Sequence, residues 1–221
     1  MEYIHEERNV LPKTFCKEII EKFESDSRRG PGKLKSGVID HMLKKYTDLS
    51  IELITGWGVE INRLKEVFNT AFINYRNYLK LNVFGEDKVH IVDQIFNNPY
   101  TLRSGFLMGR YDVGGHFNWH IDYVHGEERI CNFIIYLNDH EACTEFLNGK
   151  KIKPEAGKIL FFPTTWVHAH RGETIKKGDK YVITGFIGYQ ENLTQSSGVT
   201  IRGGRFLKSN LSTLPFTVTY D

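Results

Sequence analysis

The second half of the chain is a run of short β-prone segments, with turn residues between them and no helical segment interposed. Strands are predicted at Thr101–Tyr111, Phe117–Asp122, Ile130–Leu137, Lys158–Phe162, Val167–Arg171 and Lys180–Tyr189. Turn-forming pairs such as Gly114-Gly115 and Asn138-Asp139 separate them. A parallel sheet would need helical crossovers between its strands, so this succession favours a sandwich or barrel.

The first half of the chain has helical rather than β periodicity. After Pro12, with Thr14 as the expected N-cap, apolar side chains recur at helical spacing at Phe15, Ile19, Ile20 and Phe23. A longer stripe is formed by Ile61, Leu64, Phe68, Phe72, Tyr75 and Leu79. Residues Ser25 to Gly37 are rich in Ser, Gly, Arg and Lys and predict a loop. The expected fold class is mostly β with N-terminal helices, a jelly roll buttressed by α-helices.

The chain length fits one structural domain with three parts. We expect residues 1–88 to be an N-terminal helical support region and residues 89–190 to be the β core. Residues 191–221 are expected to form a C-terminal extension that packs on this core. The chain has 221 residues, of which 40% are hydrophobic, and this is enough to bury a sizeable core without disulfides or a structural metal.

Charge and composition exclude several classes of protein. The formal net charge is +2, and short basic pairs such as Arg28-Arg29 and Lys44-Lys45 never extend into a tract, so they predict a solvated surface and disfavour a nucleic-acid partner. Three widely spaced cysteines predict neither a disulfide framework nor a zinc site. The polar N-terminus and the lack of a long apolar run predict a cytoplasmic protein without a membrane partner. The oligomeric state has no indicator in the sequence.

A histidine and an aspartate stand two residues apart in one predicted strand. Because alternate side chains of a strand share a face, His120 and Asp122 are expected to project together, with Phe117, Trp119 and Ile121 on the other face. With 9 His and 27 acidic residues, about one such pair is expected by chance. The pair alone is therefore weak support for a metal site.

Two further histidines and a lysine downstream strengthen this interpretation. His168 and His170 follow the strand that ends in Phe161-Phe162, and Lys180 begins the next β-prone run. Two histidines and one carboxylate on one face of a metal leave three positions open, which is typical of non-haem iron(II) oxygenases. A 2-oxo acid can fill two of these positions, and O₂ can fill the third. The charges of iron(II), Asp122, a 2-oxo dicarboxylate and Lys180 would then cancel, as a buried site requires.

From Thr101 to Phe186 the chain resembles the prolyl 4-hydroxylase-type Fe(II)/2-oxoglutarate oxygenases, including bacterial and phage versions. The resemblance lies in an ordered set of motifs rather than in any one of them. The set consists of His120-x-Asp122, Tyr136-Leu137-Asn138, the turn Glu155-Ala156-Gly157 before Phe161-Phe162, then His170 and Lys180. Two positions depart from the family: Phe117 replaces a frequent tyrosine, and Gly185-Phe186 stands where a tryptophan is common.

The resemblance implies a double-stranded β-helix of the jelly-roll, cupin-like kind, and it implies roles for named residues. His120, Asp122 and His170 would be both the catalytic and the metal residues that bind iron(II), because the family spacing selects His170 over His168. Lys180 and the Tyr136 hydroxyl would contact the far carboxylate of 2-oxoglutarate, Tyr111 would lie near its chelating end, and Arg129 would lie near the substrate entrance. The implied cofactors are Fe(II), 2-oxoglutarate and O₂, and a role for ascorbate is left open.

The resemblance also implies an activity and leaves alternatives. The expected enzyme is a dioxygenase that hydroxylates an unactivated C–H bond of a prolyl residue in a peptide or protein, or of a related small amino acid, and releases succinate and CO₂. One alternative is a nucleic-acid demethylating dioxygenase, but these enzymes place paired arginines where this chain has the single Lys180. The other is a non-catalytic jelly-roll binding module, which would be expected to have lost at least one of the four motif positions.

Overall fold

The computed structural model describes residues 2–34, 36–96, 100–102, 105–124 and 129–189. Its strands are β1 (His5–Glu7), β2 (Gly30–Pro31), β3 (Lys44–Lys45), β4 (Thr47–Ser50), β5 (Tyr100–Leu102), β6 (Leu107–Tyr111), β7 (His116–His120), β8 (Arg129–Tyr136), β9 (Thr144–Phe146), β10 (Lys151–Ile152), β11 (Lys158–Pro163), β12 (His170–Gly172) and β13 (Lys180–Tyr189). Its helices are α1 (Lys13–Ser25), α2 (Gly58–Tyr78) and α3 (Val89–Phe96), with short helical turns η1 (Ile51–Leu53), η2 (Leu79–Phe84), η3 (Glu86–Lys88) and η4 (Trp166–His168).

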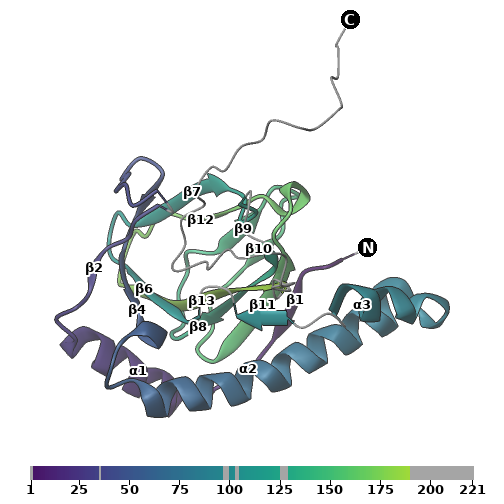
Figure 1. Cartoon of the computed structure of the whole chain (residues 1–221). Coiled ribbons are helices and arrows are strands. Elements are labelled where there is room, and N and C mark those ends of the chain that lie inside the picture. The colour runs from purple at the N-terminus through teal and green to yellow at the C-terminus, as the bar shows by residue number, and fades with distance from the viewer. Residues whose placement is uncertain (1, 35, 97–99, 103–104, 125–128, 190–221) are drawn as a thin grey trace, which may run out of the picture. The chain divides into compact units, whose positions relative to one another are not determined.

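The strands form two antiparallel sheets. In the larger sheet the strand order is β1-β11-β8-β13-β6-β4-β2, and β5 also pairs with β13. The smaller sheet has the order β10-β9-β12-β7-β3. Helices α1 and α2 run along the side of the larger sheet that faces away from β7, β12 and β9 (Figure 1). The expected fold class, mostly β with helices that buttress a jelly roll, is confirmed.

The sequence of β8 is almost continuously apolar because each of its faces packs in a core. Cys131, Phe133 and Ile135 point to one face of the larger sheet and join the core formed with the helices. Ile134 and Tyr136 point to the other face and join a second core between the two sheets. Both faces of the strand are therefore buried, and the period of two that marks a half-exposed strand disappears.

Helix α2 packs its aromatic stripe against the outer face of the larger sheet. The ring of Phe68 lies 4.9 Å from that of Phe133, and Tyr75 stacks on Phe161 at 5.0 Å, measured between ring centroids. All six residues of the predicted stripe are buried. Aromatic pairs at these distances add stabilisation to the area that they bury, so α2 supports the sheet from which the cavity between the two sheets is built.

Three helix or strand boundaries differ from those predicted from the local sequence. Helix α1 begins at Lys13 with Pro12 as its N-cap and no side-chain cap, because proline already has the required backbone angle; Thr14 is inside the helix. The expected strand over residues 101–111 is interrupted, since Gly105 has a φ of 64° and β6 starts only at Leu107. The expected strand over residues 167–171 is instead the turn η4 followed by β12.

The segment 1–88, expected as a helical support region, also supplies strands to both sheets. Strand β1 extends the larger sheet by pairing with β11, whereas β3 extends the smaller sheet by pairing with β7. Strands of two or three residues are too short to show periodicity, so the sequence did not reveal them. Residues 191–221, expected to form a C-terminal extension, lie outside the described residues. No helix in the described ranges has the length and apolar character needed to cross a membrane.

Phe72 and Ile73 are neighbours on α2 that test the packing of this helix. Phe72 is fully buried, whereas Ile73 is 53% exposed. Phe72→Ala is expected to lower the free energy of unfolding by about 3–5 kcal/mol, because it leaves a cavity in the core. Ile73→Ala, the control, should change it by less than about 0.5 kcal/mol. Chemical denaturation measures both; equal effects would contradict the described orientation of α2.

Candidate metal centre

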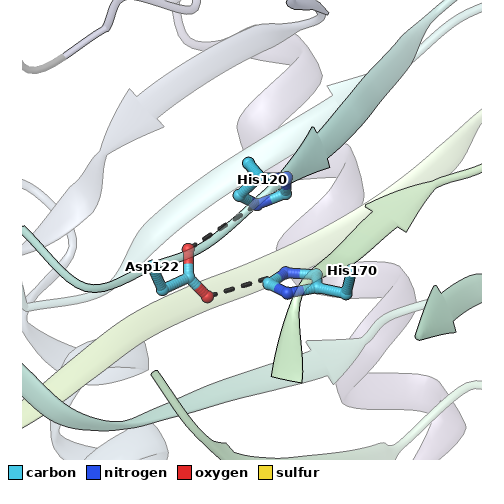
Figure 2. A group of neighbouring side chains, drawn as sticks. All are labelled: His120, Asp122 and His170. Atoms are coloured by element: carbon cyan, nitrogen blue, oxygen red, sulfur yellow. Dashed lines mark ion pairs between the residues drawn. The ribbon is translucent and has the colours of Figure 1, made fainter. Parts of the chain in front are cut away.

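Three side chains with metal-ligating atoms converge between the two sheets. His120 ends β7, Asp122 follows two residues later, and His170 begins β12. The Nε2 atoms of His120 and His170 lie 3.6 Å from Oδ1 and Oδ2 of Asp122, respectively. One ligand atom from each residue lies within 4.8 Å of the other two. Figure 2 shows the two imidazoles beside each other, each directed at a different oxygen of the carboxylate. The structure thus brings together the three predicted residues, and His168 is not one of the group.

A β-bulge in β7 determines which side chains face this group. His170 pairs with His120 and Gly172 pairs with Phe117, so three steps along β7 match two steps along β12. The extra residue brings Phe117 to the same face as His120, and the two rings stack with centroids 3.5 Å apart. The expectation that Phe117 points away from His120 is therefore wrong. Trp119 and Ile121, expected on the other face, are 41% and 43% exposed.

Backbone carbonyl groups orient both imidazole rings. Nδ1 of His120 lies 2.8 Å from the carbonyl oxygen of Asn118, and Nδ1 of His170 lies 3.1 Å from that of His168. Each Nδ1–H donates to its carbonyl, which leaves the Nε2 lone pair directed at the shared centre. Burial, together with the nearby His170, lowers the pKa of His120 to about 4, so its ring is neutral near pH 7 and can bind a metal. His168 thus contributes its backbone oxygen rather than its ring.

The carboxylate of Asp122 is also held in place. It is buried, and the side-chain amide of Asn132 donates a hydrogen bond to its Oδ2. Nη1 of Arg129 donates to the Asp122 backbone oxygen at 3.4 Å. Asn132 is not among the site residues predicted from the sequence. The feature that could have identified it is its position as the single amide within the apolar run of β8. A buried polar group needs a hydrogen-bond partner, so such a residue is expected to contact another polar group.

A cavity of about 410 Å³ extends from the three ligand residues. Lys180, 3% exposed, lies in its wall, with Nζ 3.2 Å from the carbonyl oxygen of Ala142 and 5.3 Å from the centre of the Tyr111 ring. No carboxylate among the described residues is within ion-pairing distance of this ammonium. Burial lowers the pKa of Lys180 to about 8. The cavity therefore contains a buried cation that an anionic ligand would stabilise.

The other residues expected at the cosubstrate, Tyr111 and Tyr136, and the one expected at the substrate entrance, Arg129, lie around the same cavity. Tyr111 and Arg129 line it, and the guanidinium of Arg129 lies 3.8 Å from the centre of the Phe186 ring. Tyr136 is fully buried, and its hydroxyl donates to Oγ1 of Thr144 at 2.7 Å. Thr144 lines the cavity, whereas Tyr136 lies behind it. Thr144 is thus a further candidate that the sequence did not reveal.

Lys44 lines the cavity too, although the pair Lys44-Lys45 was expected on the solvated surface. Lys44 is 8% exposed, and its ammonium donates to the Tyr46 hydroxyl at 3.2 Å. The cause is the pairing of β3 with β7, which places Lys44 opposite Phe117. The surface interpretation is wrong for Lys44 and correct for Lys45, which is exposed. A two-residue strand that joins a distant sheet leaves no local signal for this difference.

A second, larger depression does not contain these residues. It has a volume of about 1370 Å³ and is lined largely by charged side chains, including Lys153, Glu173 and Asp179. None of the three metal-ligating residues lines it. The size of a cavity does not by itself indicate a functional site. The smaller cavity is the better candidate, because it contains two imidazoles, a carboxylate and a lysine whose pKa is lowered.

The region of the chain that contains this candidate site is similar to known proteins. Residues 106–188 match the family model of the 2OG-Fe(II) oxygenase superfamily. A PKHD-type hydroxylase of Prochlorococcus marinus (strain NATL2A) is 31% identical in an alignment of 113 positions that covers 44% of this chain and 50% of that protein. A relative from strain NATL1A is 32% identical over a region of the same length. The chain spans about half the length of the curated relatives it matches.

Solved structures share the fold at low sequence identity. A viral collagen prolyl hydroxylase from Paramecium bursaria Chlorella virus 1 aligns with 86% of this chain and 97% of its own, with a TM-score of 0.56 and 18% identity. A prolyl hydroxylase from Trichoplax adhaerens, in complex with a hypoxia-inducible-factor peptide fragment, aligns with 88% of this chain and 87% of its own, with a TM-score of 0.67 and 16% identity. The resemblance to prolyl 4-hydroxylase-type oxygenases is confirmed.

The two histidines of β12 and its preceding turn provide a matched test of the metal centre. His170→Ala is expected to weaken or abolish the binding of one divalent metal ion per chain, because it removes an Nε2 ligand atom. His168→Ala should bind the metal like the parent, because only its backbone oxygen serves the site. Calorimetric titration with iron(II) under anaerobic conditions measures both. Loss of binding in His168→Ala alone would exclude the described group of ligands.

Proposed function

We propose that this chain, whose residues 106–188 match the family model of the 2OG-Fe(II) oxygenase superfamily, is an iron(II)- and 2-oxoglutarate-dependent dioxygenase that hydroxylates an unactivated C–H bond. The observation that carries the proposal is the group of His120, Asp122 and His170, whose ligand atoms lie within 4.8 Å of one another. The group lies beside a cavity that also contains the buried ammonium of Lys180.

The residues present fit iron(II). Two neutral imidazoles and one carboxylate are the donor set of the non-haem iron(II) oxygenases, and they leave three positions for other ligands. The hydrogen bonds from Nδ1 to backbone carbonyls and from Asn132 to the carboxylate fix all three donors before a metal binds. We therefore assign His120, Asp122 and His170 as the iron ligands.

The wall of the cavity fits 2-oxoglutarate. We assign Lys180 to the far carboxylate of this cosubstrate and Thr144 to a hydrogen bond with the same group. Tyr136 would act by orienting the Thr144 hydroxyl, to which it donates. The Lys180 ammonium lies over the ring of Tyr111. This ring would cover the metal-chelating end of 2-oxoglutarate and help to exclude water. The buried lysine gains a counter-charge when the dicarboxylate binds, and this offsets the cost of its burial.

Iron(II) and 2-oxoglutarate, when bound, supply an oxidation in which a C–H bond, O₂ and 2-oxoglutarate are converted to an alcohol, succinate and CO₂. The protein's own contribution is position and shielding. The stacked Phe117 ring covers one face of His120, and the buried aromatic side chains Phe146 and Phe162 pack around His170. These contacts keep water from the ligands and leave the cavity as the route to the metal.

We propose a prolyl residue in a peptide or protein as the substrate. Two of the solved neighbours are prolyl hydroxylases, and one of them is in complex with a peptide. Exposed apolar side chains near the cavity suit a peptide: Ile121 lines it, and Tyr123 and Trp166 are 50% and 75% exposed. The amide of Tyr123 donates to the carbonyl of Thr164 at 3.0 Å, which holds these segments together. The cytoplasmic location expected from the sequence stays a prediction.

Succinate release is the direct test of this activity. The iron(II)-loaded protein is expected to produce succinate and CO₂ from 2-oxoglutarate, and a proline-containing peptide should stimulate this reaction several-fold. Asp122→Ala should abolish it, because the metal loses its anionic ligand. Alkylated DNA serves as the competing substrate in parallel assays. Stimulation by DNA alone, or a folded, iron-loaded protein without succinate release, would overturn the proposal.

The buried ammonium of Lys180 makes 2-oxoglutarate binding dependent on pH. The protonated form binds the dicarboxylate, and in the free protein burial lowers the pKa of Lys180 to about 8. The dissociation constant should therefore rise above about pH 8, at most about tenfold per pH unit. Below about pH 8, Lys180→Ala removes one partner of a buried pair and should cost about 3–5 kcal/mol, on the order of a hundredfold or more. The dissociation constant of this variant should not depend on pH, so its difference from the parent should shrink above about pH 8.

The control for this dependence is Lys180→Arg, because a guanidinium stays charged throughout the range. Its dissociation constant is expected to be flat between pH 7 and 9.5, although the larger side chain changes its absolute value. The measurement is an anaerobic titration of the iron(II)-loaded protein, followed by the visible band that a chelating 2-oxo acid produces. A parent protein whose titration did not change with pH would exclude Lys180 as the anchor.

A further inference from the structure

Lys44 is a second buried cation in the cavity. Its ammonium lies 4.8 Å from the centre of the Tyr46 ring and 5.2 Å from that of Phe117. Within the part of the chain that the structure describes, no carboxylate is within ion-pairing distance, and the Tyr46 hydroxyl is its hydrogen-bond acceptor. An ammonium donates three hydrogen bonds, so Lys44 keeps donor capacity toward the cavity that it lines.

The charges around the cavity do not cancel once the proposed ligands are counted. Among the described residues that line it, the two buried lysines, Lys44 and Lys180, face the single carboxylate of Asp122. Iron(II) and 2-oxoglutarate contribute opposite charges of the same size. A cationic excess therefore remains, and its buried member, apart from Lys180, is Lys44. Burial lowers the pKa of Lys44, and the negative charges of Asp48 and Asp122 oppose this effect.

Both carboxylates of the proposed cosubstrate already have a partner. One carboxylate of 2-oxoglutarate chelates the metal, and the other is assigned to Lys180. Lys180 contacts the Tyr111 ring, Tyr111 stacks on Tyr46 at 5.0 Å, and Lys44 contacts Tyr46. A stacked pair of rings thus connects two separate cationic positions. The position at Lys44 borders Phe117 and, through it, His120.

We propose that Lys44 binds a carboxylate of the substrate and so selects an acidic substrate for oxidation at the metal centre. This inference rests on the proposed function and names the class of substrate that the same site accepts. The carboxylate has three possible sources: a free amino acid, the C-terminus of a peptide, or an aspartate or glutamate side chain beside the target residue. All three present the same anion to the ammonium, within a cavity where a charge pair is shielded from water.

Binding of paired acid and amide probes distinguishes these sources. The protein is loaded with manganese(II) and 2-oxoglutarate, so that binding is measured without turnover. Calorimetry then compares L-proline with L-prolinamide, an acetylated peptide ending in proline as acid and as amide, and an end-blocked peptide containing Pro-Asp with its Pro-Asn counterpart. In at least one pair the acid is expected to bind at least tenfold more tightly, and that pair identifies the source.

Variants of the two adjacent lysines assign this preference. Lys44→Met should reduce the ratio of acid to amide affinity to near one, while Lys44→Arg should keep a clear preference. Lys45→Met is the matched control, because Lys45 is exposed on the same strand, and it should keep the full ratio. A purely structural role for Lys44 would change both members of a pair alike and leave the ratio unchanged.

Failure of this inference differs from failure of the proposed function. If no pair shows an acid preference, or if the preference survives Lys44→Met, Lys44 does not bind a substrate carboxylate and the inference is overturned. The chain can still be a dioxygenase in that case, as succinate release would show. If 2-oxoglutarate neither binds nor yields succinate, the proposed function fails, and the inference fails with it.

Discussion

The pairing of β7 with β12 is the constraint on which the rest of the site depends. These two strands are far apart in the sequence, and their register sets His170 opposite His120, while the bulge between them turns Phe117 to the same face. A shift of one residue would send His170 to the other face of the sheet and separate it from Asp122. The neighbouring pairings of β12 with β9 and of β7 with β3 hold this register from both sides.

Burial changes the protonation and the electrostatic energy of the residues at this site. His120 is kept neutral, Asp122 is held by an amide, and two lysines are buried in the same cavity without a carboxylate partner among the described residues. Each buried charge is costly by itself and becomes favourable when an opposite charge arrives. The proposed binding of anionic ligands would therefore draw on these buried charges, and it would depend on pH because burial lowers the pKa of both lysines.

The helices serve the site indirectly. Helix α2 places Phe68, Phe72 and Tyr75 against the outer face of the larger sheet, whose inner face helps to line the cavity. Strand β8 packs on α2 through one face and presents Asn132 to Asp122 from the other. The supporting core and the candidate metal centre therefore share one sheet.

The sequence by itself determined the fold class, the aromatic stripe of α2 and the three residues that converge at the candidate metal centre. The fold class and the stripe follow from short periodic patterns of apolar residues. The three site residues follow from the order of short motifs along the chain. Only the tertiary structure decided that Phe117 faces His120, that Asn132 holds Asp122, and that Lys44 is buried while Lys45 is exposed. The physical reason is that these features depend on contacts between strands that are distant in the chain. The bulge, the two-residue strand and the buried amide each depend on such a contact, and the local sequence does not show which strands pair.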